Sequence, residues 1–567
     1  MELCFGWFLL VASIPAIFAQ DISHGSIVVD GTMTVAQTDD NFVCATIDWW
    51  PYDKCNYDQC PWHHTSVMNL NLSHPFLAKA IQAFNRLRIR VGGSLQDQVL
   101  YDVGNLKSPC HPFQKMKDGL FGFSKGCLHM ERWDELNRFF KETGAMVTFG
   151  LNALHGRHKI KRSLWGGDWD SSNAQDFMKY TISKGYQIDS WEFGNELSGN
   201  GIGAHVHADQ YGKDLVNLRK IINELYKGSQ SKPSLIAPGG FYDEEWFVKL
   251  LQTSGFGVID VMSHHMYNLG AGVDPKLVSK ILNPDHLNKA AYTFGNLTHI
   301  IRRHGPWTSA WVGESGGAYN SGGAHVSNTF VNSFWYLDQL GMASKYHTKD
   351  VENFFVYDRA ELVWRFLTPF VLMVLNSGLL WHRLMGKVVL NVESHASPFL
   401  RSYAHCSKGR AGVTLLVINL SNQTNFIMNA QNSINLKLAA NEQNISRDSF
   451  THNLKKTFSW VGTKASDDAL LREEYHLTPK DGYLRSQTMV LNGIPLELTS
   501  TGDIPSLNPV RVNVKSPITI SPLSIAFIVF PNFEAPACST MRGLTCDLAG
   551  EYSSCKHLTP YELGMQA

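Results

Sequence analysis

The 567-residue sequence lacks several features that mark large classes of proteins. Its formal net charge is zero, because 50 lysines and arginines balance 50 aspartates and glutamates, so bulk electrostatics does not predict a nucleic-acid partner. No G-x-G-x-x-G fingerprint opens a helix after the first expected strand, and the H-E-x-x-H zinc motif is absent. The sequence therefore gives no reason to expect a nucleotide cofactor or a helical zinc site.

Long hydrophobic runs are also scarce. The run from Cys4 to Phe18 is short and broken by Pro15, which favours a signal peptide over residues 1–19 rather than a membrane anchor. Its first residues lack the usual positive charge. We expect a secreted protein, extracellular or in the cell wall, without an integral membrane span. Delivery to a lysosome or vacuole and peripheral association with a membrane stay open.

Cysteines number ten, and nine remain once Cys4 leaves with the signal peptide. In an oxidising compartment some of them are expected to form disulfides, and the odd number leaves at least one free or paired between chains. Candidate N-glycosylation sequons lie at Asn71, Asn296, Asn419, Asn422 and Asn444.

The composition is that of a large globular protein, with 44% apolar and 18% charged residues. Apolar strands alternate with amphipathic helical stretches from residue 42 to residue 358, which favours a parallel sheet covered on both sides. This pattern predicts an α/β fold, a (β/α)₈ TIM barrel, with an open doubly wound sheet as the alternative. The expected strands are Phe42–Trp50, Leu87–Gly93, Met146–Leu154, Ile188–Glu196, Ser234–Gly240, Val258–Tyr267, Ser309–Gly317 and an eighth near residues 351–358.

The pattern of apolar and polar residues changes after Gly386. Short alternating runs with turn residues follow, including Val413–Ile418, Gln487–Leu491 and Ile518–Phe530. This pattern predicts a C-terminal antiparallel β-sandwich. Beyond Phe533 the chain is polar and contains three cysteines.

Two glutamates follow buried strands: Glu196 in IDSWEFGNEL and Glu314 in SAWVGESGG. Because active sites of parallel barrels lie at the carboxyl ends of strands, glutamates on the fourth and seventh strands are expected to face each other. Hydrolysis of a glycosidic bond requires one carboxylic acid for the leaving oxygen and one carboxylate at the developing positive carbon. A lone glutamate at a strand end is usually solvated or capping, but this pair predicts a glycoside hydrolase.

Other polar and aromatic residues have a structural interpretation beside a functional one. Glu192 shares its strand face with Glu196 and is interpreted as a structural carboxylate. His264 and His265 lack metal-ligand spacing, so substrate hydrogen bonding is expected rather than a metal site. The run Arg157–Arg162 is interpreted as a solvated loop, with attraction of an acidic polysaccharide as the alternative. Stacking on sugar rings is the alternative to packing for Trp49, Trp165, Trp169 and Trp307.

The segments around these residues resemble one family. IDSWEFGNELSGNGIG, DVMSHHMYNLG, WVGESGGAYNSGGAHVSNTFVNSFWYLDQLGMAS, VAQTDDNFVCATIDWWP, RIRVGGSLQD, FGLNAL and LLWHRLMGKVVL are similar to the plant heparanase-like proteins of glycoside hydrolase family 79. The resemblance implies a (β/α)₈ barrel, and a β-sandwich that takes in an N-terminal strand. It also implies retaining β-glucuronidase chemistry without a metal or cofactor, on an acidic polysaccharide, a proteoglycan or a small glucuronide.

The resemblance also implies roles for individual residues. Glu196 matches the family's proton donor, Glu314 its nucleophile, and Asn195 the amide that contacts the sugar 2-hydroxyl. Asp48, His265 and Tyr267 match family positions that line the glucuronide subsite. Cys406 and Cys538 match a pair that the family links by a disulfide within the sandwich.

The expected organisation follows from the pattern and the resemblance together. It comprises a signal peptide (1–19), an N-terminal segment that joins the β-sandwich (20–40), a catalytic barrel (41–385), the β-sandwich (386–535) and a cysteine-containing tail (536–567).

One segment departs from the family. Where the family reads roughly Cys-Arg-Gln…Gly-Gly-Asn-Tyr-Gly and helps bind the uronic carboxylate, this chain reads DVENFFVYDRAELVWRFLTPFVLMVLNSG. Residues 350–378 are therefore interpreted as a replaced segment, from an alternative or mispredicted exon, which puts barrel closure and glucuronide affinity in question. The alternatives are a retaining β-glycosidase for a neutral sugar and a catalytically impaired carbohydrate-binding protein.

Overall fold

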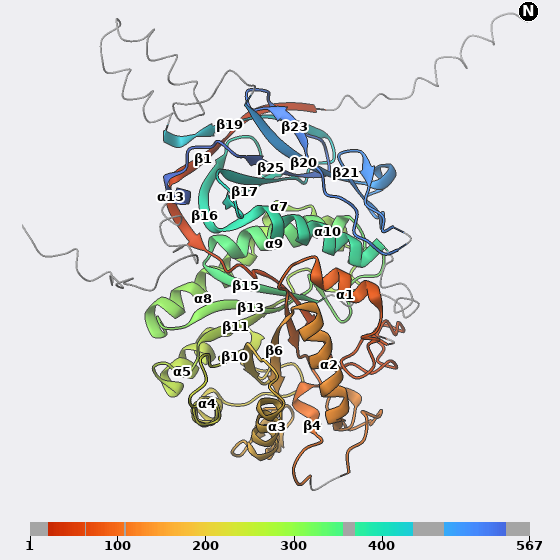
Figure 1. Ribbon diagram of the computed structural model, residues 1–567, viewed down its shortest axis with the longest axis vertical. Coiled ribbons are helices and arrows are strands. Elements are labelled where there is room, and N and C mark those ends of the chain that lie inside the picture. The colour runs from red at the N-terminus through yellow and green to blue at the C-terminus, as the bar shows by residue number, and fades with distance from the viewer. Residues whose placement is uncertain are drawn as a thin grey trace, which may run out of the picture.

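The structure is a computed structural model that describes residues 21–62, 64–106, 109–354, 369–434, 470–499 and 501–539. It consists of a closed barrel of parallel strands and a mainly antiparallel sheet of eleven strands. In Figure 1 the barrel lies below the sheet, with helices α9 (Val331–Lys345) and α10 (Pro369–Leu384) between them. The expected signal peptide, Asn444, Cys546 and Cys555 lie outside the described residues.

The barrel confirms the predicted (β/α)₈ fold and excludes the open sheet, because its eight strands close on themselves. In the seven strands whose side chains are described, nearly every side chain is buried, as expected for strands covered by helices outside and packed side chains inside. The strands are β2 (Val43–Ile47), β3 (Arg88–Val91), β6 (Met146–Leu151), β9 (Ser190–Phe193), β10 (Ser234–Phe241), β11 (Val261–Met266), β13 (Ser309–Ser315) and β15 (Thr348–Phe354).

The eighth strand is present despite the replaced segment. β15 pairs in parallel with β13 on one side and with β2 on the other, so it completes the barrel. It begins three residues before the expected range 351–358 and ends at Phe354. The expectation that residues 350–378 endanger barrel closure is therefore wrong for the strand itself, because the backbone pairing needs only Thr348–Phe354. Residues 355–368 lie outside the described part of the chain.

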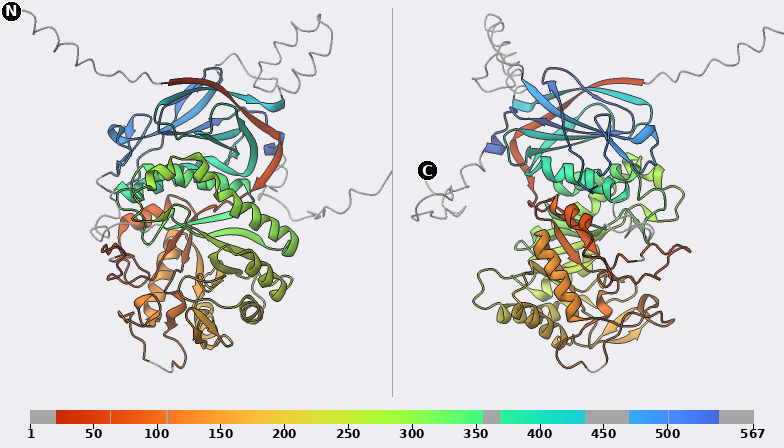
Figure 2. Two further views of the ribbon diagram at one scale, coloured as in Figure 1. Left: turned by 180° about the vertical axis from the view of Figure 1, so that it is seen from behind. Right: turned by 45° about the vertical axis from the view of Figure 1, so that its right-hand side comes forward.

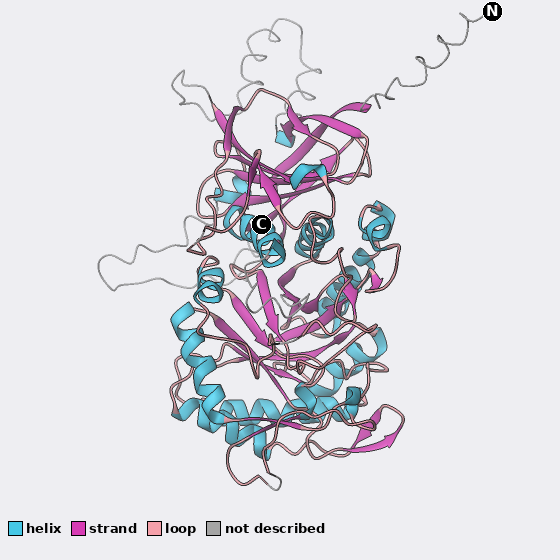
Figure 3. Ribbon diagram, turned by 90° about the vertical axis from the view of Figure 1, so that its right-hand side faces the viewer, coloured by secondary structure: helices cyan, strands magenta, loops and turns pink. Residues whose placement is uncertain are grey.

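Helices cover the outside of the barrel (Figure 3). Local sequence determines several of their ends. The Asp243 side chain accepts a hydrogen bond from the Trp246 N–H at the start of α5 (Glu244–Ser254), and Gly144, with φ 70°, ends α2 (Met130–Thr143). The helical segment between β11 and β13 includes α7 (Pro284–Asn288) and α8 (Ala290–His304). The other barrel helices are α1 (Pro75–Gln82), α2 (Met130–Thr143), α3 (Ser172–Ser183), α4 (Ala208–Leu225), α5 (Glu244–Ser254) and α6 (Leu277–Ile281).

Three pairs of short strands lie in the loops of the barrel in the described part of the chain. They are β4 (Val99–Tyr101) with β5 (Gly126–Leu128), β7 (His158–Lys161) with β8 (Leu164–Gly166), and β12 (Gly270–Ala271) with β14 (Ala318–Tyr319). Among the described residues, no helix is both long and apolar enough to cross a membrane.

The sheet domain joins the two ends of the chain. β1 (Asp21–Gln37) pairs antiparallel with β16 (Met385–Ser394) and parallel with β19 (Thr424–Asn432), and Figure 2 shows it crossing the top of the domain. The predicted run Ile518–Phe530 is two strands, because a turn at residues 521–523 separates them. The remaining elements are β17 (Leu400–Ser407), β18 (Val413–Asn419), β20 (Leu471–Pro479), β21 (Met489–Leu491), β22 (Ile494–Pro495), β23 (Val510–Asn513), β24 (Ile518–Ile520), β25 (Ser524–Phe530) and α13 (Pro536–Ser539).

This sheet encloses an apolar core of its own. β24, at one end of the strand order, packs against β18 and β25 in its middle, and all three strands contribute buried side chains to one cluster. The sheet therefore curls over itself, which gives the predicted β-sandwich domain from a single connected sheet. A disulfide joins Cys406 on β17 to Cys538 in α13, with an S–S distance of 1.96 Å.

A buried ion pair connects the barrel to the sheet domain. Asp338 on α9 accepts hydrogen bonds from Arg401 Nε at 2.7 Å and Nη2 at 3.2 Å, and from the Tyr403 hydroxyl at 2.5 Å. Asp338 is only 2% exposed, so its charge depends on these donors. Removal of one partner of such a pair leaves the other buried without compensation.

Replacement of Asp338 by alanine should therefore lower the free energy of unfolding by about 3 kcal/mol, measured by urea denaturation. The control is Asp40→Ala, which breaks the exposed pair between Asp40 and Lys387 (3.0 Å) and should change stability by less than about 1 kcal/mol. Equal losses in the two variants would contradict the importance of the buried pair.

Candidate active site

The loop after β9 aims Glu196 into the mouth of the barrel. Gly194 and Glu196 both have left-handed backbone conformations, with φ 69° and 54°, and the Glu196 N–H donates to the Gly239 carbonyl at 2.7 Å. Glycine adopts such a conformation without strain, whereas glutamate does so at an energetic cost that the surrounding structure must offset. The loop is therefore held in a shape that the glutamate does not itself prefer.

Asp97 holds the same loop from the side. Its carboxylate accepts hydrogen bonds from the N–H groups of Asn195 (2.8 Å) and Ala153 (2.7 Å), which follow β9 and β6. Asp97 is buried, and burial raises its pKa to about 7 against the opposing effect of these hydrogen bonds. The sequence analysis did not identify this residue, although its place three residues after a strand-ending Gly-Gly-Ser was a usable indication.

Glu314 lies within β13 and is held at both carboxylate oxygens. The Tyr267 hydroxyl donates to Oε1 at 2.6 Å, and Arg90 Nη1 donates to Oε2 at 3.1 Å. Both donors suit an anionic oxygen, and together they fix the plane of the carboxylate. Glu314 is 6% exposed, so it reaches the solvent only through the pocket described below.

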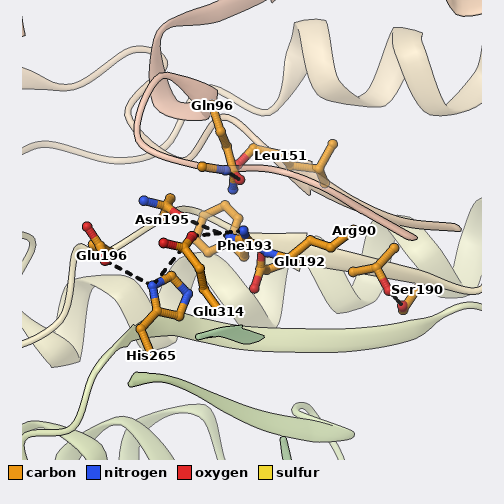
Figure 4. A network of polar contacts seen from close by, with 12 residues as sticks. Arg90, Gln96, Leu151, Ser190, Glu192, Phe193, Asn195, Glu196, His265 and Glu314 are labelled. Carbon is orange, nitrogen blue, oxygen red and sulfur yellow. Dashed lines mark hydrogen bonds and ion pairs between the residues drawn. The ribbon is translucent and has the colours of Figure 1, made fainter. Parts of the chain in front are cut away.

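His265, on β11, stands between the two glutamates (Figure 4). Its Nδ1 lies 3.0 Å from Glu196 Oε1 and 3.8 Å from Glu314 Oε2. One oxygen of each glutamate and one ring nitrogen of His265 all lie within 4.8 Å of one another. The structure thus brings together two residues that are 118 positions apart in the numbering, from Glu196 to Glu314.

Arg90 is the residue beneath this group that the sequence analysis missed. Its guanidinium is fully buried and donates to Glu192 Oε2 at 2.7 Å, to Glu314 Oε2 at 3.1 Å and to Asn195 Oδ1 at 2.9 Å. Glu192 therefore has the structural role that the sequence predicted, as a partner of Arg90. An arginine inside the apolar strand LRIRV was the available indication, because a buried guanidinium requires anionic partners.

Burial shifts the pKa values of Glu196 and His265 in opposite directions. It raises the pKa of Glu196 to about 7, partly opposed by the charge of Arg90, and lowers the pKa of His265 to about 3. Burial and then the charge of Glu314 raise the pKa of Asp48 well above its ordinary value. Near neutral pH, His265 is thus an uncharged hydrogen-bonding group, and Glu196 readily carries a proton.

A pocket of about 490 Å³ opens over these groups, lined by Asp48, Glu196, Tyr267 and Glu314. Asp48 is pressed against the backbone, since a Cβ at Gly93 would lie 2.1 Å from its Oδ2. Asn195 lies beneath, and its amide Nδ2 has no hydrogen-bond partner among the described residues. The six expected site residues therefore occupy one site.

None of the four tryptophans named as alternatives for stacking on sugar rings lines the pocket. Trp49 and Trp169 are buried in the barrel core, and neither Trp165 nor Trp307 lines the pocket. These four tryptophans are packing residues, in line with the default interpretation. The lining aromatic residues include Trp50, Trp62, Phe121, Phe241 and Tyr319.

The basic run Arg157–Arg162 lies away from this pocket. Arg157 is buried and pairs with Asp214 at 2.5 Å, so the interpretation of the run as a solvated loop is wrong for this residue. The exposed residues of the run form the hairpin strand β7. The interpretation as a solvated segment holds for β7, and no residue of the run lines the pocket between the glutamates.

The residues Glu196, His265 and Glu314 have the spacing of a three-ligand metal site, but their environment disfavours a cation. The Arg90 guanidinium already contacts Glu314, and His265 Nδ1 is engaged with Glu196. His264 points elsewhere, with its Nδ1 3.0 Å from the Trp311 carbonyl oxygen. Its part in substrate hydrogen bonding is therefore excluded by position.

The covalent features are distributed over both domains. Besides the sheet-domain pair, disulfides join Cys55 to Cys60 and Cys110 to Cys127, and Cys44 is buried outside any disulfide. Of the candidate glycosylation sites, Asn71 and Asn422 are exposed and Asn296 is half-buried. Asn419 is a wrong candidate, because it is fully buried and its Nδ2 donates to the carbonyls of Thr424, Ile520 and Ser521.

The chain is similar in sequence to proteins of one glycoside hydrolase family. The family model "Glycosyl hydrolase family 79, N-terminal domain" matches residues 24–341. The chain is 61% identical over 528 residues to "Heparanase-like protein 1" of Arabidopsis thaliana, which covers 92% of this chain and 96% of that protein. It is 36% identical over 512 residues to "Baicalin-beta-D-glucuronidase" of Scutellaria baicalensis, covering 88% and 90%.

The fold is also similar to solved structures. A 4-O-alpha-L-rhamnosyl-beta-D-glucuronidase from Fusarium oxysporum 12S aligns with a TM-score of 0.59 at 13% identity, over 89% of this chain and 100% of that chain. The GH51 arabinofuranosidase from Xanthomonas axonopodis pv. citri aligns with a TM-score of 0.57 at 12% identity, over 90% and 99%. These likenesses show the architecture of barrel and sheet domain.

The raised pKa of Glu196 predicts a pH-dependent effect of Glu196→Gln on stability. Between pH 4.5 and about 7 the folded protein keeps this proton while the unfolded chain releases it, so the wild type loses stability as pH rises. The glutamine variant lacks this loss. Its stability relative to wild type should therefore increase by about 2 to 3 kcal/mol from pH 5 to pH 8, measured by urea denaturation. The same difference at both pH values would contradict the shift.

Proposed function

Because the chain belongs to the heparanase-like proteins of glycosyl hydrolase family 79, we propose that it is a retaining β-glucuronidase that cleaves β-linked glucuronic acid. The observation that supports this proposal most is the pair of buried carboxyl groups, with oxygens within 4.8 Å of each other. Retaining enzymes hold their two carboxyl groups about 5–5.5 Å apart, whereas inverting enzymes leave room for a water molecule between them.

In the first step, a carboxylate oxygen of Glu314 attacks the anomeric carbon as the bond from that carbon to the leaving oxygen breaks. Glu196 transfers its proton to the leaving oxygen, which departs as an alcohol. The support for this assignment is the contrast in environment: Glu196 has a pKa of about 7, while both oxygens of Glu314 accept hydrogen bonds. The product of this step is an ester between Glu314 and the sugar.

In the second step, the ionised Glu196 takes a proton from a water molecule, whose oxygen attacks the anomeric carbon and displaces Glu314. Two displacements on one carbon restore the original β configuration. Because His265 is uncharged near neutral pH, it can hydrogen-bond Glu196 in both protonation states without adding a charge beside the reacting carbon.

Asn195 is proposed to bind the sugar. Arg90 holds its Oδ1, which leaves the buried, unpartnered Nδ2 as a donor for a hydroxyl group of the substrate. A buried amide donor without a partner carries a desolvation penalty that a bound hydroxyl removes. Asp48 and Tyr267, which also line the pocket, are the further proposed substrate contacts.

Secretion is also part of the proposal. The three disulfides support it, because such bonds persist in oxidising compartments and are rare in the reducing cytosol.

The intact pair of glutamates argues against the alternative of a catalytically impaired binding protein.

Replacement of Glu314 by alanine should lower kcat on a 4-nitrophenyl β-glucuronide by roughly four orders of magnitude, because no covalent intermediate can form. Azide, which fits the vacated space, should restore turnover and give the α-glucuronyl azide by a single displacement. Glu245→Gln, at an exposed position on α5, is the control and should keep the wild-type rate. Wild-type activity of Glu314→Ala would refute the assignment.

The role proposed for Glu196 predicts a dependence on the leaving group. Glu196→Ala should slow hydrolysis of a phenyl glucuronide by about 10²- to 10⁴-fold, but affect formation of the intermediate much less with a 2,4-dinitrophenyl leaving group, which needs no proton. In the wild type, kcat/KM should fall above about pH 7 as the free enzyme loses this proton. Both effects are measured by steady-state and burst kinetics, and an equal loss on the two substrates would argue against an acid role.

A further inference from the structure

The proposed substrate carries a carboxylate, and the pocket offers one basic side chain to bind it. Among the described residues that line the pocket, Lys54 is the sole lysine or arginine. Arg90 lies beneath the pocket and uses Nε, Nη1 and Nη2 on Glu192, Glu314 and Asn195. An anionic group that enters the pocket therefore meets Lys54 as the cation that is not already committed.

The Lys54 ammonium is held above an aromatic ring. Its Nζ lies 4.2 Å from the centroid of the Trp50 ring, and the residue is half-buried. No described carboxylate lies within ion-pair distance of this Nζ. Burial lowers the pKa of Lys54, while the nearby charge of Asp48 opposes that effect. A half-desolvated ammonium that is in ion-pair contact with no described carboxylate is a favourable partner for the carboxylate of a ligand.

The loop that carries Lys54 is fixed before any ligand binds. The disulfide between Cys55 and Cys60 closes the chain directly after Lys54. Two side chains of the loop also donate hydrogen bonds to the Ser321 hydroxyl, Asn56 through Nδ2 at 2.8 Å and Trp62 through Nε1 at 3.1 Å. Ser321 follows the strand of Glu314 and lines the same pocket. Lys54 is thus held in a constrained position relative to the glutamates, which reduces the entropy lost on binding.

We propose that Lys54 binds the carboxylate of the glucuronic acid residue and so determines the preference for a glucuronide over a neutral glycoside. This inference rests on the proposed function. It assigns the recognition of the acid group to the loop of residues 51–62, of which Lys54, Asn56 and Trp62 line the pocket. Lys54 is a specificity-determining residue rather than a catalytic one, because the bond changes occur at the anomeric carbon.

The test compares Lys54→Met and Lys54→Arg with the wild type on 4-nitrophenyl β-glucuronide and 4-nitrophenyl β-glucoside. Loss of a charged hydrogen bond should lower kcat/KM of Lys54→Met on the glucuronide by about 10- to 100-fold, mainly through KM. The glucoside rate should change by less than about threefold, and Lys54→Arg should keep most of the glucuronide activity. The inhibition constant of free glucuronate should rise in Lys54→Met by the same factor as KM.

Lys115→Met is the matched control, because Lys115 is an exposed lysine that contacts Asp53 of the same loop at 3.6 Å but does not line the pocket. It should leave both substrates and the inhibition constant unchanged. Thermal denaturation of all three variants checks that the fold is intact.

The outcomes separate the two proposals. An active wild type whose KM and glucuronate inhibition are unchanged by Lys54→Met overturns the assignment of Lys54 alone. An equal loss on glucuronide and glucoside also overturns it, since that result indicates a structural role. An effect confined to an acidic polysaccharide would place Lys54 at a neighbouring sugar and equally overturn it, because the aryl glucuronide carries its one carboxylate on the cleaved residue. A wild type that hydrolyses the glucoside but not the glucuronide refutes the proposed function itself.

Discussion

The buried guanidinium of Arg90 is the constraint on which the active site depends. It lies at the bottom of the barrel mouth and donates to Glu192, Glu314 and Asn195, which come from two other strands and the loop after one of them. A cation in this position is tolerated only with anionic and hydrogen-bonding partners around it, and the buried glutamates need the cation in return. Folding of the barrel therefore fixes the orientation of the candidate nucleophile Glu314 and of the Asn195 amide together.

The same burial gives two identical residue types different properties. Glu196 shares a hydrogen bond with an uncharged imidazole and, being desolvated, has a pKa of about 7. Glu314 accepts one bond from a guanidinium and one from the Tyr267 hydroxyl. A water-filled site would weaken these differences, because solvent screens both desolvation and charge interactions. The division of roles proposed for the pair depends on the depth of the pocket.

The barrel and its loops contribute different parts of the site. β13 and the short loop after β9 position the two candidate catalytic carboxyl groups, whereas the walls come from loops such as residues 51–62 and the segment around Ser321. The loop of Lys54 is closed by its own disulfide and bonded to the opposite wall. A change in substrate preference can thus arise in such a loop without disturbance of Arg90 or the glutamates, since none of the bonds of Arg90 involves it.

The sequence by itself determined the barrel strands and the candidate glutamates, because buried parallel strands are continuous apolar runs and strand ends carry the polar groups. The alternating runs after Gly386 also predicted the sheet domain, and the resemblance to the family predicted the Cys406–Cys538 disulfide. Tertiary structure alone decided that Arg90 joins the site, that Trp50 rather than Trp49 faces the pocket, and that Asn419 is buried. The physical reason is that adjacent residues such as Trp49 and Trp50 share a local pattern, while their surroundings depend on side chains from distant strands and loops.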